Sequence, residues 1–205
     1  TRKIESNPLI DVAIDYFITS ITANNDYLFE NLVKTNPQSM LFVHADFLDG
    51  LGVNLMEHLK VLGRQKADAL IIDSDLINDD TSFEDLDNIV NLGLVKFIGL
   101  CAGENTKEAI KIIKQRVGYE LNYLMLPNVC PTDFSYGDYT LGVREELMII
   151  GCNPFGGYLS APRNIEAFTV GYLLHFASNY SDLLTLSGRD VYNFTKNCDY
   201  IKKKI

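Results

Sequence analysis

The chain has 205 residues, of which 47% are hydrophobic, and its formal net charge is −9 at pH 7. A chain of this length and composition can bury a substantial core, so we expect a single domain spanning residues 1–205. The acidic charge argues against nucleic acid and anionic membranes as main partners, and without a long apolar segment or a signal peptide we expect no membrane insertion.

The first part of the chain alternates between apolar segments and amphipathic ones. Segments 8–14 and 40–44 are predicted strands, and each precedes a predicted helix, 27–34 and 52–62 respectively. Gly63 is the stop signal of the second helix. We expect that helix to bury the apolar side chains Val53, Met56, Leu59 and Val61.

Residues 67–100 predict a complete strand–helix–strand unit. The strand 68–73 has a continuous apolar centre, as expected of a strand that is buried on both faces. A helix over 82–91, with Gly93 as its stop signal, and a strand over 95–99 follow, and about 30 residues suffice to connect two parallel strands in this way. In parallel α/β folds chemistry lies beyond the carboxyl ends of the strands, which here are Asp73 and the residues after Gly99.

The second half of the chain continues the alternation. The further predicted strands are 120–126, 147–152 and 183–186. The further predicted helices are 106–116, 141–147, 164–178 and one that begins near residue 190. The segment 127–140 is long enough to be a binding loop. The aromatic helix 164–178 is expected to be deeply buried or, as the alternative, covered by a partner.

Strand and helix alternate about seven times, which favours a parallel α/β fold. At this number of units a TIM-type (β/α) barrel is favoured over an open, doubly wound sheet. Such a barrel has eight strands, so a first βα unit is expected to be missing from this chain.

Several short motifs occur in the order and spacing found in aldo-keto reductases. Residues 9–16 carry the pattern D-x-A-x-x-Y, and residues 68–73 resemble the segment D-L-Y-L-I-H of the family's fourth strand. Residues 86–101 and 146–157 follow two further family stretches. The series covers nearly the whole chain and resembles the aldo-keto reductase family, and the part from Asp68 to Cys130 is also similar to the modifier subunit of glutamate–cysteine ligase.

The resemblance implies carbonyl reduction by NADPH through an Asp, Tyr, Lys and His tetrad. Asp11 and Tyr16 match its first two members, whereas Asp46 and Asp73 occupy the Lys and His positions. A lysine lowers the pKa of the proton-donating tyrosine, and a carboxylate there raises that pKa. A carboxylate in place of the histidine also repels, and so destabilises, the negative charge that develops on the carbonyl oxygen during hydride transfer. Both replacements oppose the reaction.

The cofactor positions that the resemblance implies are altered as well. Asn122 matches the family, as do Ser187 and Arg189 in the phosphate-binding segment, where an arginine near a helix start can meet a phosphate. In the family an aromatic residue stacks on the nicotinamide, and Cys152 occupies its position here. Tyr123 occupies the position of a family glutamine. We therefore expect no cofactor, or NADP if the chain is an enzyme after all.

These observations favour an aldo-keto-reductase-like pseudoenzyme that serves as a structural or regulatory subunit of a larger assembly, with a protein partner. The alternative is a divergent NAD(P)H-dependent oxidoreductase that reduces a carbonyl substrate with Tyr16 as proton donor. Fold alone does not decide between them.

Metal chemistry is a third possibility. Asp11, Asp46 and Asp73 are expected near one mouth of the barrel, and His44 shares a strand face with Asp46, so Mg²⁺ or Mn²⁺ could bind there. Hydrated or helix-capping aspartates explain the same pattern, and we predict no metal site. The four cysteines are widely spaced without a C-x-x-C pair, which indicates a reducing, intracellular compartment, most simply the cytoplasm.

Overall fold

The computed structural model describes residues 16–22, 27–116, 120–131, 143–144, 146–154 and 167–185. The chain divides into two compact units, a first unit of Ile14–Met125 and a second unit of Leu126–Ile205 together with Thr1–Ala13. The predicted strand 8–14 lies outside the described residues, as does the helix predicted to begin near residue 190.

The first unit is a parallel sheet whose neighbouring strands follow the order of the sequence. Its strands are β1 (Tyr16–Ser20), β2 (Met40–Ala45), β3 (Ala67–Asp73), β4 (Val95–Cys101) and β5 (Leu121–Leu126). The connecting elements are α1 (Tyr27–Thr35), α2 (Leu51–Val61), the 3₁₀ turn η2 (Ser74–Leu76), α3 (Glu84–Asn91) and α4 (Thr106–Lys114). The predictions for β2 to β5 are confirmed to within two residues, whereas β1 was not predicted.

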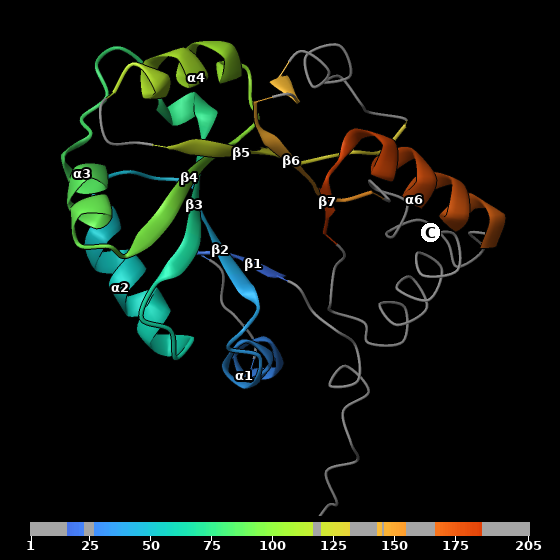
Figure 1. Cartoon of the computed structure of the whole chain (residues 1–205), viewed down its shortest axis with the longest axis horizontal. Helices are drawn as coiled ribbons and strands as arrows, with labels where there is room; N and C mark the ends of the chain where they lie inside the picture. Colours follow the sequence, from blue (N-terminus) through green and yellow to red (C-terminus); the bar gives the residue numbers. More distant parts are fainter. Residues whose placement is uncertain are drawn as a thin grey trace, which may run out of the picture. The chain divides into compact units, whose positions relative to one another are not determined.

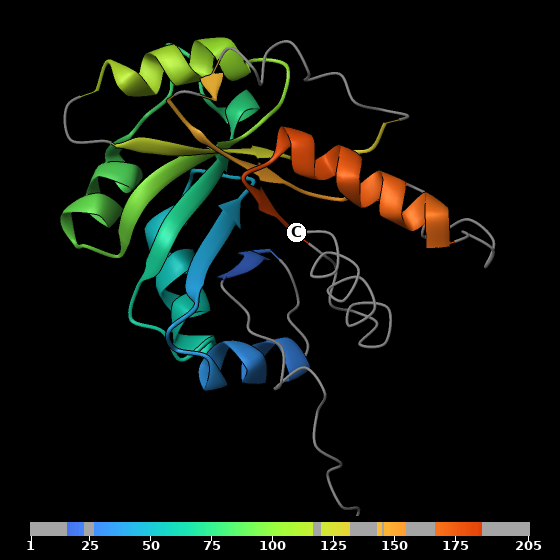
Figure 2. The same ribbon diagram turned by 45° about the vertical axis from the view of Figure 1, so that its right-hand side comes forward.

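The sheet of the first unit is curved, and α2, α3 and α4 lie along its convex side in both views (Figures 1 and 2). The side chains that face these helices are apolar and fully buried, among them Val43, Leu70, Ile72 and Leu100. Neighbouring residues in a parallel register point to the same face, and alternate residues along a strand point to opposite faces. The other face of the sheet therefore carries Phe42, His44, Ile71, Asp73 and Cys101.

Helix α2 buries a different face from the predicted one. Leu51, Leu55 and Leu59 are buried, at a spacing of four residues, together with His58. The predicted core residues Val53, Met56 and Val61 are instead 59%, 45% and 48% exposed, so only Leu59 was assigned to the correct face. The helix has two apolar faces, and local periodicity does not decide which of them meets the sheet. One tertiary contact that orients it is the Leu51 amide, which donates to Asp85 Oδ2 of α3 at 3.2 Å.

Two glycines end helices as predicted from the sequence. Gly63 follows α2 and Gly93 follows α3, with φ angles of 65° and 67°. This left-handed conformation costs a residue with a Cβ atom, so glycine is favoured where the chain turns out of a helix. Arg64 then donates to the carbonyl oxygens of Asn36, Pro37 and Ser39 at 2.8–3.1 Å, which holds the turn before β2.

The second unit contains β6 (Met148–Gly151), α6 (Ala167–Tyr180) and β7 (Leu183–Leu184). Strands β6 and β7 are parallel. Asp182 joins them to the preceding turn, since it accepts from the amide of Ile149 at 2.8 Å and forms an ion pair with Arg144 at 2.9 Å.

Helix α6 is only partly buried, contrary to the prediction. Leu173, Leu174 and Ala177 are buried, whereas Tyr172 and His175 are exposed. Within the described residues, no helix combines the length and the apolar character required to span a bilayer.

Candidate functional site

Three polar side chains meet at the carboxyl edge of the first unit's sheet. His44 is the second-last residue of β2, Asp73 the last of β3, and Cys101 the last of β4. Asp73 lies opposite Cys101 in the strand register, and His44 lies opposite Ile71. All three side chains therefore project from the concave face, away from the helices.

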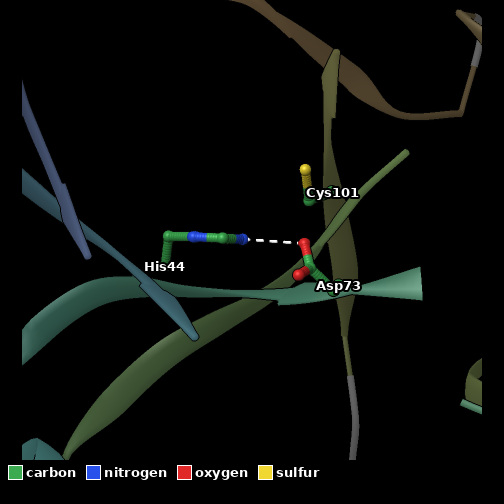
Figure 3. A group of neighbouring side chains, drawn as sticks. All are labelled: His44, Asp73 and Cys101. Carbon is green, nitrogen blue, oxygen red and sulfur yellow. Dashed lines mark hydrogen bonds and ion pairs between the residues drawn. The ribbon is translucent and has the colours of Figure 1, made fainter. Parts of the chain in front are cut away.

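The three side chains converge on one small volume (Figure 3). His44 Nε2 lies 2.8 Å from Asp73 Oδ1, so imidazole and carboxylate form a charge-assisted hydrogen bond when the ring is protonated. One ligand atom from each of His44, Asp73 and Cys101 lies within 4.8 Å of the other two. The His44 and Asp73 side chains are 20% and 36% exposed, whereas Cys101 is 8% exposed. The group is thus open to solvent on the Asp73 side.

An aromatic layer lies on the same face, displaced from the three polar side chains toward the amino ends of the strands. The Tyr123 ring packs edge-on against Phe42 and Phe97, with centroids 5.0 and 5.9 Å apart, and Phe42 packs in turn against Tyr16 at 5.7 Å. Burial raises the pKa of Tyr123, and the charge of Asp68 raises it further. The raised pKa makes the Tyr123 phenol a weaker acid than a free tyrosine, and its ring contributes packing to this layer.

A hydrogen-bond network holds the loops directly after Asp73 and Cys101. The Gly103 amide lies 2.9 Å from Ser74 Oγ and 2.8 Å from Thr106 Oγ1, and the two hydroxyls are 3.1 Å apart. Asp75 Oδ1 accepts from the amide of Asn105 at 2.9 Å. Since Ser74 and Thr106 are buried, this network fixes the backbone next to the site.

The structure separates Tyr16 from this edge. Tyr16 is the first residue of β1, where it pairs with Met40, whereas Ser20 is the residue beside His44. At a rise of about 3.3 Å per residue, these two ends of β1 are about 13 Å apart. Tyr16 and Asp73 thus belong to opposite edges of the sheet. Asp11 lies outside the described residues, and its role stays a prediction.

The remaining predicted site residues are also dispersed. Asp46 follows β2 and is exposed, and the residue that contacts Asp73 is His44, two positions earlier. Asn122 is the second residue of β5, and its amide donates to Glu120 Oε1 at 3.1 Å. Ser187 and Arg189 lie outside the described residues.

Asp73 and His44 were candidates from the sequence, whereas their meeting with Cys101 was not predicted. The signal was available in the alternation of strand residues, because His44 and Asp73 each point away from the apolar, helix-facing side. Within the part of the chain that the structure describes, this is the one group of three His, Cys, Asp or Glu side chains close enough to share an ion. It offers one nitrogen, one oxygen and one sulfur ligand.

Comparison with known proteins identifies the fold. No protein-family model and no curated protein sequence matches the chain. An aldo-keto reductase of Bacillus halodurans in its holo form matches at a TM-score of 0.67 and 11% identity, over 92% of this chain and 76% of that one. An aldo/keto reductase of Brucella melitensis matches at 0.64 and 14%, over 91% and 78%.

A third similar structure is a Bombyx mori aldo-keto reductase in complex with NADP, at a TM-score of 0.64 and 16% identity, over 91% of this chain and 73% of that one. These likenesses confirm the predicted fold class, parallel strands alternating with helices in the manner of the aldo-keto reductase barrel. They also confirm the predicted resemblance at the level of fold, with a sequence that has diverged far from these structures.

Proposed function

We propose that this chain is an aldo-keto-reductase-like protein without tyrosine-dependent carbonyl reduction, and that it acts as a structural or regulatory subunit for a protein partner. The observation that carries the proposal is Asp73 at the end of β3, hydrogen-bonded to His44 at 2.8 Å. By the family resemblance this position belongs to the histidine that faces the substrate carbonyl.

The negative charge of Asp73 is the physical reason to expect no carbonyl reduction. Hydride transfer to a carbonyl builds negative charge on its oxygen, and preorganised donors stabilise that charge. A carboxylate at the same place repels it. The His44 ring lies beside Asp73, but its Nε2 is directed at Asp73 Oδ1 and so is not available to a substrate oxygen (Figure 3).

The position of Tyr16 supports the same conclusion. The alternative function, an NAD(P)H-dependent oxidoreductase, requires the tyrosine hydroxyl at the carboxyl edge, next to the reacting carbonyl. Tyr16 begins β1 at the amino edge and packs against Phe42. The similar Bombyx mori structure is a complex with NADP. Binding of this cofactor is therefore the property that distinguishes an oxidoreductase from a non-catalytic subunit.

Exposed apolar side chains support a protein partner. Val53, Met56 and Val61 lie exposed along α2, and Leu92 is exposed just after α3. The wide cysteine spacing favours a reducing, intracellular compartment for this function, and the net charge of −9 argues against nucleic acid.

The test is a titration of the purified chain with NADPH, followed by thermal unfolding and by cofactor fluorescence. We expect no stabilisation at millimolar NADPH and no oxidation of NADPH with aldehyde or ketone substrates, while a tetrad-bearing aldo-keto reductase serves as the positive control. A ligand present at 100 times its Kd stabilises a protein by about 2.7 kcal/mol, so micromolar binding is readily seen.

Micromolar NADPH binding together with carbonyl turnover that Tyr16→Phe abolishes would establish the alternative instead. For the subunit function, the supporting result is a partner that co-purifies in fixed stoichiometry and whose activity changes when the purified chain is added. A partner activity that stays the same with and without the chain contradicts a regulatory function.

A further inference from the structure

The group at the carboxyl edge goes beyond the proposed subunit function, because its three side chains are suited to a ligand of their own. His44, Asp73 and Cys101 present an imidazole nitrogen, a carboxylate oxygen and a thiol sulfur within 4.8 Å of one another. We propose that these three residues bind a divalent transition metal ion, and that zinc suits the site best.

The ligand set selects this class of metal. Zinc takes sulfur, nitrogen and oxygen ligands together in a tetrahedral arrangement, and catalytic zinc sites hold three protein ligands with a fourth position open. Magnesium and calcium prefer oxygen ligands throughout, and only Asp73 offers one in this group. A mixed set with one thiolate therefore favours zinc or a metal of similar softness.

The distances fit with small side-chain movements. Metal–ligand bonds of about 2.0–2.3 Å place the ligands of a tetrahedral zinc about 3.3–3.6 Å apart. The 2.8 Å contact between His44 Nε2 and Asp73 Oδ1 must open by about half an ångström. The other pairs, which lie within 4.8 Å, must close by no more than about 1.5 Å. We expect rotation of the Asp73 and Cys101 side chains to supply these movements while the strands stay in register.

The backbone that carries the ligands is rigid. His44, Asp73 and Cys101 lie in three neighbouring strands whose register is set by the sheet. The buried pair Ser74 and Thr106 fixes the loops that leave β3 and β4. Such preorganisation lowers the cost of assembling a site. Because Asp73 is partly exposed, water can complete the coordination.

The alternative chemistry for a Cys, His and Asp group is a nucleophilic relay, which the arrangement does not favour. A relay needs the imidazole between thiol and carboxylate, with one ring nitrogen facing each. In Figure 3 the sulfur of Cys101 lies on the Asp73 side of the ring, and Nε2 already faces the carboxylate. Ligands that converge on one point are the geometry of a metal site.

The experiment uses the tag-free chain, treated with a chelator, dialysed and kept reduced, and titrated with Zn²⁺ and with Co²⁺ as a spectroscopic probe. We expect one ion per chain, a raised Tm, and a thiolate-to-cobalt charge-transfer band. Cys101→Ser should remove that band, and Asp73→Asn and His44→Ala should each weaken Zn²⁺ binding at least on the order of a hundredfold, more than the loss usual for an outer-shell partner.

Matched controls separate the site from unspecific binding. Cys152→Ser removes a thiol outside the group, and Asp46→Asn removes a nearby exposed carboxylate, so both should bind Zn²⁺ as the unaltered chain does. Circular dichroism and the Tm of each metal-free variant establish that it is folded. The proposal is overturned if Co²⁺ gives no thiolate band, or if folded Cys101→Ser and Asp73→Asn variants keep the affinity. This outcome is independent of NADPH binding, so it leaves the proposed function standing.

Discussion

The carboxyl edge of the sheet and the aromatic layer beneath it lie on one face of the same sheet and differ in almost every property. At the edge, His44, Asp73 and Cys101 are polar and converge near solvent. One step deeper, Phe42 and Tyr123 pack edge-on in a buried layer. The difference assigns packing to the deeper level of this face and leaves the polar groups, to which we propose that a metal ion binds, at the edge. Substitutions in the layer should therefore change the free energy of unfolding, and substitutions at the edge should change ligand binding.

Phe42→Ala should have the largest effect on stability. The ring is fully buried and contacts both Tyr16 and Tyr123, so its removal leaves a cavity within the layer. We expect a loss of about 3–5 kcal/mol in the free energy of unfolding, measured by urea titration. Leu92→Ala, at an exposed position, should change it by less than about 0.5 kcal/mol. Equal effects at the two positions would contradict the assignment.

Gly99→Ala should be the next largest. A Cβ atom at Gly99 would collide with the Ile71 side chain and lie 2.9 Å from Tyr123 Cβ, between the layer and the edge. Overpacking of this kind costs about 1–3 kcal/mol.

Gly52→Ala, in the first turn of α2, is the matched control. A Cβ atom at this position meets the Ile89 side chain of α3 at an ordinary 3.7 Å. Alanine is favoured over glycine in a helix by about 0.5–1 kcal/mol, so this variant should gain stability. Opposite signs for the same substitution are the expected result, and two losses of similar size would contradict the packing at Gly99.

Asp73→Asn should leave the metal-free chain almost as stable as before. The pair with His44 is partly exposed, and pairs of this kind contribute about 0–1 kcal/mol. In contrast, the rise in Tm with Zn²⁺ should be lost. A large drop in the Tm of the metal-free variant, with Zn²⁺ stabilisation retained, would reverse the roles of the edge and the layer.

The last prediction concerns the pH dependence of stability at His58, a site in neither region. Burial lowers the pKa of His58 below its ordinary value of 6.5. Because the unfolded chain then binds a proton that the folded chain resists, the free energy of unfolding decreases as the pH falls below about 6.5.

One group contributes at most about 1.4 kcal/mol per pH unit. His58→Leu should remove this part of the slope, as measured by urea unfolding between pH 5 and pH 7.5. A slope that is the same in the variant would show that other groups produce it.

Element positions followed well from the sequence where strands are buried on both faces. The apolar run of β3 and the glycines after α2 and α3 are local signals, and they placed these elements to within two residues. The strand β1, Tyr16–Ser20, was missed although its residues favour strands, because the strand was predicted in the preceding apolar segment 8–14. The face of α2 was wrong because both of its faces carry apolar side chains, and only packing on the sheet chooses between them.

The sequence by itself determined the alternation of strands and helices, the resemblance to aldo-keto reductases, and Asp73 as the last residue of a strand. Only the tertiary structure decided which side chains meet Asp73. His44 is its hydrogen-bond partner across 29 residues of chain, whereas Asp46, chosen from the sequence, is exposed. The physical reason is that proximity across strands depends on register and on the face each residue occupies. Both are set by packing between segments that are distant in the sequence.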